Sequence, residues 1–136
     1  MKKQFTRKGI KYELDNNEIT VVGLKKKDIV ELFIPDYVDG YPVRWIYEHA
    51  FIREWFEIAS LPESITKIPN AVFYACNRLR EIEFRGENGI PIEIAQCGVG
   101  YCPNLIIIKS KRPIKKVWGD ISIQHCEKLK NIENLI

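Results

Sequence analysis

Cysteine is the residue type in this chain with the widest chemical repertoire, and it occurs four times, at Cys76, Cys97, Cys102 and Cys126. Thiolates bind zinc, and pairs of thiols form disulfides. The sequence has no C-x-x-C pair and no histidine at zinc-ligand spacing from a cysteine. Because a free thiol packs as a small apolar side chain, we predict buried, reduced thiols. Bridging of neighbouring thiols stays open in an oxidising compartment.

Catalytic and phosphate-binding patterns find little support. The two histidines, His49 and His125, belong to no recognisable nucleophile or metal motif. The glycine-rich stretches ENGIP and CGVGYC lack the lysine and the strand-to-helix setting of a phosphate loop, so they read as turns. We therefore expect no enzymatic activity, no cofactor and no metal.

A basic segment, KSKRPIKK, is the best candidate for contact with nucleic acid. It carries five positive charges in eight residues: Lys109, Lys111, Arg112, Lys115 and Lys116. Phosphate binding needs several such charges on one face, to which Lys2, Lys3 and Lys25 to Lys27 would add. The competing interpretation is a solvated edge of the fold, and we favour it.

The distribution of charge is uneven although the net charge of the 136 residues is only +3. Residues 1–27 carry eight Lys or Arg against three acids, and residues 28–64 carry two against eight. Hydrophobic residues make up 46% of the chain, which is enough for one folded domain. Such a charge pattern would help to orient a charged partner.

The first residues, MKKQFTRKGI, lack the apolar run of an export signal. As written, the sequence predicts a cytoplasmic protein, and the cell surface or secretion is the alternative if a leader has been removed. No apolar run is long enough to span a membrane, so we expect no membrane insertion.

Apolar residues recur along the chain with a period of about 24 residues. In the clearest copy, Leu79, Ile82 and Phe84 are separated by two residues and then by one. The same spacing occurs at Ile29, Leu32 and Ile34; at Phe56, Ala59 and Leu61; at Leu105, Ile108 and Ser110; and at Leu129, Ile132 and Asn134. A unit this short cannot bury its own apolar face, so the units must stack into a solenoid.

The second half of each unit repeats as well. Its members are Val43, Ile46, Ala50 and Phe51; Ile65, Ile68, Val72, Phe73 and Cys76; Ile94, Gly98, Val99 and Cys102; and Ser122, Ile123 and Cys126, with Val117 or Trp118 in the earlier apolar place. We predict a short strand ended by Pro35 or Pro62 and a helical turn over residues 71–77. An N-terminal hairpin is predicted from two segments of alternating apolar and polar residues, GIKYEL and EITVVGL, which flank the turn residues DNN. The predicted organisation is a β cap over residues 1–28 and four to five repeats over residues 29–136.

Three features together resemble the BspA-type, or Treponema pallidum-type, leucine-rich repeat. They are the terminal IP or LP, the Val-x-x-Ile step and the run A-F-x-x-C-x-x-L-x-x-I. The phrase IPDYVDGYPVRWIYEHAF is especially similar to the first unit of that family. The resemblance implies an α/β repeat, a right-handed solenoid with a parallel sheet, and adhesion or protein binding in bacteria. The chain departs from the pattern at Glu54, at Gly98 and Val99, and at Ser122 and Ile123.

Outward strand positions are where leucine-rich repeats usually bind. They predict a protein-binding face made of Glu31, Phe33, Ile58, Ser60, Glu81, Glu83, Ile107, Lys109, Asn131 and Glu133. Tyr37, Tyr41, Trp45, Tyr47 and Trp55 would be either anchors or core residues. Our first hypothesis is a non-enzymatic protein-binding module, either an adhesin or a small intracellular binder or inhibitor; the alternative is a nucleic-acid-associated protein. The apolar end at Leu135 and Ile136 also suggests an end-to-end dimer.

Overall fold

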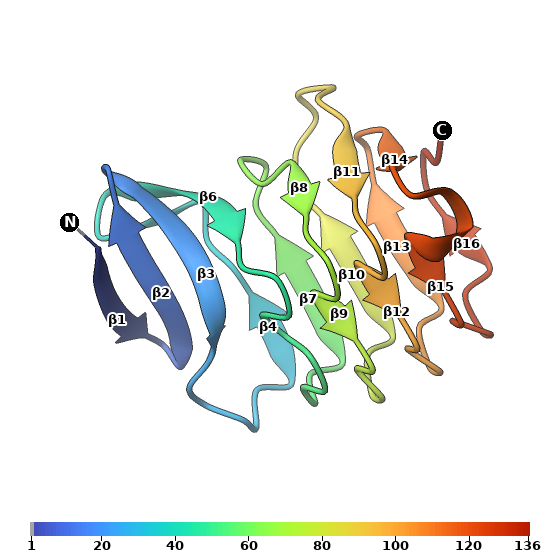
Figure 1. Cartoon of the computed structure of the whole chain (residues 1–136), viewed down its shortest axis with the longest axis horizontal. Helices are drawn as coiled ribbons and strands as arrows, with labels where there is room; N and C mark the ends of the chain where they lie inside the picture. The colour runs from blue at the N-terminus through green and yellow to red at the C-terminus, as the bar shows by residue number, and fades with distance from the viewer. Residues whose placement is uncertain (1) are drawn as a thin grey trace.

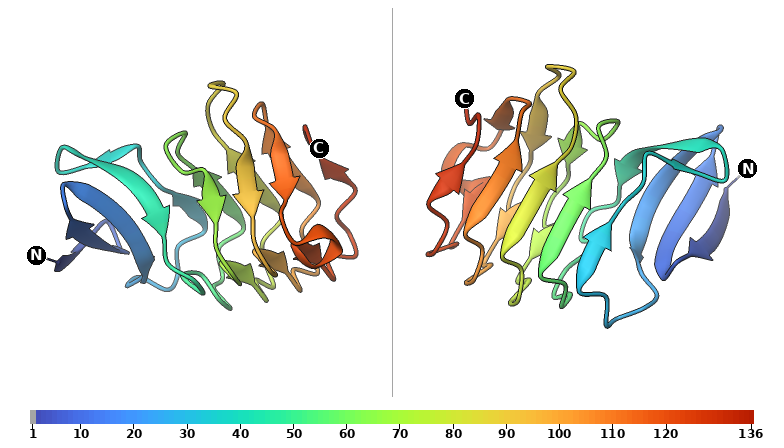
Figure 2. Two further views of the ribbon diagram at one scale, coloured as in Figure 1. Left: turned by 45° about the horizontal axis from the view of Figure 1, so that its top comes forward. Right: turned by 180° about the vertical axis from the view of Figure 1, so that it is seen from behind.

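The computed structural model describes residues 2–136, so Met1 of the predicted cap lies outside it. From residue 31 onward the chain winds into a solenoid of five turns, with short parallel strands arranged in three sheets around one core (Figures 1 and 2). The long sheet contains β4 (Glu31–Phe33), β7 (Ile58–Leu61), β10 (Glu81–Phe84), β13 (Ile107–Ser110) and β16 (Asn131–Ile132). The second contains β8 (Lys67–Ile68), β11 (Ile92–Ile94) and β14 (Ile114–Lys116), and the third β9 (Phe73–Tyr74), β12 (Val99–Gly100) and β15 (Ile123–Gln124).

The register of the long sheet matches the repeat in the sequence. Strand pairing aligns the inward residues Leu32, Ala59, Ile82, Ile108 and Ile132 in one row. Pro35 and Pro62 follow β4 and β7 closely, where a residue without an N–H group ends ladder pairing. The predicted inward and outward alternation is confirmed.

The N-terminal residues form a separate mixed sheet that also takes in residues 37–46 of the first turn, beyond the predicted cap (Figure 1). It contains β1 (Lys3–Arg7), β2 (Ile10–Asp15), β3 (Glu18–Leu24), β6 (Tyr41–Ile46) and β5 (Tyr37–Val38). The predicted hairpin is present, because β2 and β3 pair antiparallel and Asn16 and Asn17 take φ of 51° and 61° in the turn. The sequence reasoning missed β1, which pairs with β2.

The predicted α/β class is wrong, since the only helix in the described residues is the 3₁₀ turn η1 (Gly119–Ile121). Residues 71–77 hold the short strand β9 and turns instead of a helical turn. Ala71 and Ala75 have φ of 56° and 57°, values that a right-handed helix cannot contain. The three-residue spacing of Phe73, Cys76 and Leu79 therefore reflects inward positions at successive bends of a solenoid turn.

Phenylalanine rings and thiols fill the interior of the middle turns. Phe51, Phe56 and Phe73 are fully buried, with ring centroids 5.6 to 6.1 Å apart. Cys76 and Cys102 are also fully buried, as predicted, whereas Cys126 in the last turn is half-buried. All four thiols are free. In the first turn, Glu54 stands at the cysteine position and is held by Lys27, with 2.8 Å between Oε2 and Nζ.

The prediction for the fourth unit needs correction. Val117 and Trp118 are 42% and 55% exposed, so neither fills the inner apolar place. Ile114 does so instead, being fully buried and paired with Ile92 of the preceding turn. Strands β11 and β14 both begin directly after a proline, Pro91 and Pro113, so the inward residue that the two units share is the one after the proline, and Lys116 takes the place beside Ile94.

Candidate protein-binding face

The eight residues predicted to bind protein all lie on the long sheet, which faces the viewer in the right panel of Figure 2. Pairing places Glu31, Ile58, Glu81 and Ile107 in one row and Phe33, Ser60, Glu83 and Lys109 in the next. Phe33 is 58% exposed, and Ile58 and Ile107 are partly exposed. An exposed Phe on a regular strand surface is the kind of residue that anchors a protein partner.

Hydrogen bonds and ion pairs order the polar residues of this face. Ser60 Oγ donates to Glu83 Oε1 at 3.1 Å, and Lys109 Nζ lies 3.2 Å from Glu81 Oε1. Glu133, beyond the last strand, accepts a hydrogen bond from the Ser110 amide at 3.0 Å. The carboxylates are therefore fixed in position on the face, which gives a partner a defined pattern of acceptors.

Arg85 is a member of this face that the sequence reasoning missed. Its side chain crosses two turns of the solenoid, and its guanidinium lies 4.1 Å from the centroid of the Phe33 ring. It donates to Ser60 Oγ at 2.8 Å and to the carbonyl of Ile34 at 2.5 Å. Burial lowers the pKa of Arg85, and the nearby acids Asp36 and Glu83 oppose that shift.

A signal for Arg85 was present in the sequence. The residue after the second inward position is proline in the first two turns, at Pro35 and Pro62, and arginine in the third. A charged side chain at this place is not expected to enter the apolar core, because burial of an unpaired charge is costly.

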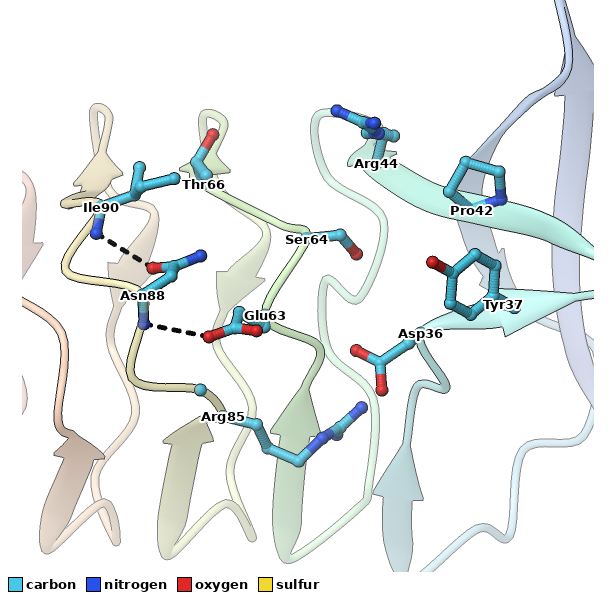
Figure 3. A pocket seen from close by; sticks show the side chains of 11 residues that line it. Asp36, Tyr37, Pro42, Arg44, Glu63, Ser64, Thr66, Arg85, Asn88 and Ile90 are labelled. Atoms are coloured by element: carbon cyan, nitrogen blue, oxygen red, sulfur yellow. Dashed lines mark hydrogen bonds between the residues drawn. The ribbon is translucent and has the colours of Figure 1, made fainter.

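Beyond Arg85, a pocket of about 600 Å³ opens between the turns that leave β4, β7 and β10 (Figure 3). Its lining residues are Asp36, Tyr37, Pro42, Arg44, Glu63, Ser64, Thr66, Arg85, Gly86, Asn88 and Ile90. Arg85 extends toward the side of the pocket that carries Asp36 (Figure 3). The pocket therefore continues the sheet face, with donors and acceptors of both charge signs.

The loop 85–91, which forms one wall of the pocket, is anchored by two charged side chains. The Glu63 carboxylate accepts hydrogen bonds from the amides of Glu87 and Asn88, at 2.8 and 3.0 Å. Arg112 is fully buried and donates to the carbonyls of Ile90, Arg85 and Ile65, at 3.1, 3.3 and 3.1 Å. Both ends and the middle of the loop are thereby held to neighbouring turns.

The structure breaks up the basic segment proposed for nucleic acid. Arg112 points into the molecule, so its inclusion in a phosphate-binding patch is wrong. Lys109 pairs with Glu81, Lys111 with Glu87 at 2.7 Å, and Lys116 with Asp120 at 3.7 Å. Lys115 alone is exposed and has no ion pair among residues 2–136. The five charges do not form one free cationic surface.

The predicted aromatic anchors lie apart from one another. Trp45 donates to Glu18 at 3.2 Å and the Tyr47 hydroxyl donates to Glu13, so both rings are fixed over the N-terminal sheet. Tyr37 is 65% exposed at the rim of the pocket, and Tyr41 is half-buried. Trp55 is 57% exposed at the opposite edge of the solenoid.

The remaining predicted sites concern the C-terminal turn and metals. Leu135 and Ile136 are 40% and 72% exposed, although the backbone of Leu135 forms a β-bridge with Ile114. Within residues 2–136, no three His, Cys, Asp or Glu side chains are grouped to hold a metal ion. No helix in the same residues has the length and apolar character needed to cross a membrane.

Comparison with solved structures shows the leucine-rich repeat fold. The chain superimposes on a leucine rich cell surface protein from Faecalibacterium prausnitzii with a TM-score of 0.70 and 17% identity, covering 98% of this chain and 43% of that one. A leucine-rich repeat protein from Bacteroides capillosus gives 0.61 and 16%, covering 98% of both chains. The leucine rich repeat protein of T. pallidum gives 0.56 and 17%, covering 98% of this chain and 83% of that one.

The chain thus spans less than half of the F. prausnitzii protein. No family model matches the sequence, and no curated protein matches it. The resemblance to T. pallidum-type repeats is confirmed at the level of the fold.

Proposed function

We propose that this leucine-rich-repeat solenoid is a non-enzymatic protein-binding module, right-handed and capped by its N-terminal hairpin, whose long sheet contacts the partner. The contact surface comprises the eight predicted face residues together with Arg85. The pocket beyond Arg85 receives a side chain or loop of the same partner.

The observation that carries this proposal is Phe33, which is 58% exposed and covered on one side by the Arg85 guanidinium. A large ring fixed by a cation is preorganised, so little side-chain entropy is lost when a partner covers it. Partly exposed Ile58 and Ile107 extend the apolar contact across the sheet, and the fixed carboxylates provide the polar rim. The backbone under these residues is a parallel sheet, so the face is presented as a rigid unit.

Two versions of this function differ in compartment. The cell-surface description of the F. prausnitzii protein favours an adhesin over an intracellular binder or inhibitor. Nothing in the geometry favours the nucleic-acid alternative, since Glu31, Glu81 and Glu83 make the sheet acidic and Arg112 is buried.

The test is a pull-down and cross-linking experiment from the source cell, with the partner identified and its affinity measured. The triple variant Phe33→Ala, Glu81→Lys, Glu83→Lys should weaken binding by about 100-fold, since it removes the anchor and reverses two rim charges. The matched control is Trp118→Ala, Glu48→Lys, Glu93→Lys, which also removes one exposed aromatic ring and reverses two carboxylates, but away from the long sheet. Unchanged binding by the first triple would place the contact elsewhere.

A further inference from the structure

The two edges of the long sheet carry opposite charge. The turns that lead into its strands, residues 25–30, 51–57, 74–80, 100–106 and 124–130, lie along the lower edge in Figure 1. They contain eight cations, Lys25, Lys26, Lys27, Arg53, Arg78, Arg80, Lys128 and Lys130, against four acids, Asp28, Glu54, Glu57 and Glu127. We call this surface the basic edge. The turns that leave the strands, residues 34–40, 62–66, 85–91, 111–113 and 133–136, carry five acids, Asp36, Asp39, Glu63, Glu87 and Glu133, against three cations, Arg85, Lys111 and the buried Arg112.

Several cations on the basic edge are free to meet a ligand. Lys25, Lys26, Arg53 and Lys130 are exposed and have no side-chain hydrogen bond or ion pair among residues 2–136. Lys27 is paired with Glu54, and Glu57 lies 3.7 Å from Arg78 and 3.3 Å from Arg80. The edge therefore offers separated positive charges with acids between them.

Apolar side chains stand among these charges. Val30, Trp55 and Ile106 are 57%, 57% and 49% exposed. The Arg78 guanidinium lies 5.7 Å from the centroid of the Trp55 ring, which holds that ring between the second and third turns. Exposed apolar groups rimmed by charge are typical of a surface that binds another protein.

Three hollows with volumes of about 270, 280 and 330 Å³ are lined by residues of the same edge. Trp55 lines the first two, and Glu57 and Arg78 line the second and third. The shared residues make the hollows neighbours, and together their linings come from all five turns. Since adjacent strands are about 4.8 Å apart, the four steps between five turns span about 19 Å, or about six residues of extended peptide.

We propose that the basic edge binds an extended acidic segment of a partner protein, in which Asp or Glu residues alternate with apolar ones. The acidic residues pair with the free cations, and the apolar residues enter the hollows beside Trp55, Val30 and Ile106. Nucleic acid and sulfated glycans fit less well, because their uniform negative charge would face Glu57 and Asp28 without apolar groups for the hollows. This surface is separate from the sheet face and does not depend on it.

The test is fluorescence anisotropy with a labelled peptide of about eight residues in which Glu alternates with Leu or Phe. Lys25→Glu, Arg53→Glu, Lys130→Glu should weaken peptide binding about tenfold or more at moderate salt, because three attractions become repulsions. The control Lys3→Glu, Lys11→Glu, Lys115→Glu has the same net charge and should leave affinity within about threefold. Equal losses in the two triples would mean non-specific attraction and would overturn the proposal.

A second variant keeps the proposal testable if the charge reversals impair folding. Trp55→Ala leaves the net charge unchanged and should weaken peptide binding about fivefold, whereas Trp118→Ala should not. Competition by an all-Glu peptide, a single-stranded oligonucleotide, a sulfated oligosaccharide and phosphatidylserine vesicles identifies the preferred ligand. The alternating peptide should bind tightest, and a tighter fit to any of the others overturns the assignment. The Phe33, Glu81, Glu83 triple should leave peptide binding unchanged, which separates this test from that of the sheet face.

Discussion

The interior of the middle turns and the loop 85–91 are both held firmly, but by different forces. Inside the turns, Phe73, Cys76 and Ile82 are fully buried and touch equivalent residues of the adjacent turns, so apolar contact holds the stack together. At the loop, Glu63 and Arg112 supply five hydrogen bonds to backbone groups of other segments. Repeated apolar contacts thus stabilise the body of the solenoid, whereas individual polar side chains hold the loop beside the pocket in place.

Loss of a ring from the interior should have the largest effect on stability. Phe73 is fully buried and packs on Phe51 and Phe56, so Phe73→Ala should lower the free energy of unfolding by about 3 to 5 kcal/mol. Urea-induced unfolding followed by tryptophan fluorescence measures this. If the interior and the loop are held independently, amide exchange at Glu87 and Asn88 should rise no more than in the body as a whole.

Removal of the buried guanidinium should come next. Arg112→Met leaves three carbonyls without their donor and should cost about 3 kcal/mol. Unlike Phe73→Ala, it should selectively speed amide exchange in residues 86–90, as measured by mass spectrometry. Arg112→Lys should recover little, because an ammonium group lacks the planar fork that reaches three acceptors. Full stability in either variant would show that the loop does not need this anchor.

Alkaline pH should weaken the interior through the ionisation of its buried thiols on unfolding. The pKa of Cys102 is raised from 9.0 to about 12: a hydrogen bond with Cys126 lowers it, and contact with Cys76 and burial outweigh that effect. Between these values the unfolded chain loses the thiol proton and the folded chain keeps it. The contribution of this thiol to stability should therefore be full below about pH 9 and fall by about 1.4 kcal/mol per pH unit above it.

Urea unfolding at several pH values from 8 to 11 checks this slope. Cys102→Ala should make the slope shallower, with Cys97→Ala as the control variant. Part of the slope should remain, because the pKa of Cys126 is also raised, by its hydrogen bond with Cys102 and by burial, and the burial persists in the variant. Burial raises the pKa of Tyr12 to about 12, so a decline that begins near pH 10 should persist in both variants. A slope unaffected by Cys102→Ala would assign the whole decline to other groups.

A backbone change in the loop should have the smallest effect. Gly86 has φ of 102°, and a Cβ at this position would overlap the Glu63 side chain. Gly86→Ala should therefore cost about 1 to 2 kcal/mol. Gly89→Ala is the control, because Gly89 also has a positive φ, of 75°, and a Cβ at that position would meet no neighbour. The control variant therefore has the backbone cost of a left-handed alanine without the overlap. Equal losses in thermal unfolding of the two variants would show that contact with Glu63 does not constrain the loop.

Much of the solenoid could be predicted from the sequence, as could the outward residues of the candidate face. Leu79, Ile82 and Phe84 repeat at a spacing that fixes which residues point inward, and strand alternation then fixes which point outward. The helical turn over residues 71–77 was predicted wrongly because a three-residue spacing fits both a helix and a bend with left-handed residues such as Ala71.

The functional detail depended on contacts that no local pattern encodes. Arg112 reads as part of a basic run, but its acceptor at Ile65 is 47 residues away in the chain. Arg85 reaches the carbonyl of Ile34, 51 residues away, and so joins the sheet face to the pocket. The basic edge likewise collects cations from four separate turns, none of which is basic enough to stand out from its neighbours except Lys25 to Lys27.

The sequence by itself determined the repeat, the register of the long sheet and the burial of Cys76 and Cys102, because these follow from the spacing of apolar residues that must be removed from water. Only the tertiary structure decided which charged side chains face inward, which are paired and which remain free along an edge. That outcome depends on the stacking of turns about 24 residues apart, which brings into contact groups that are remote in the chain.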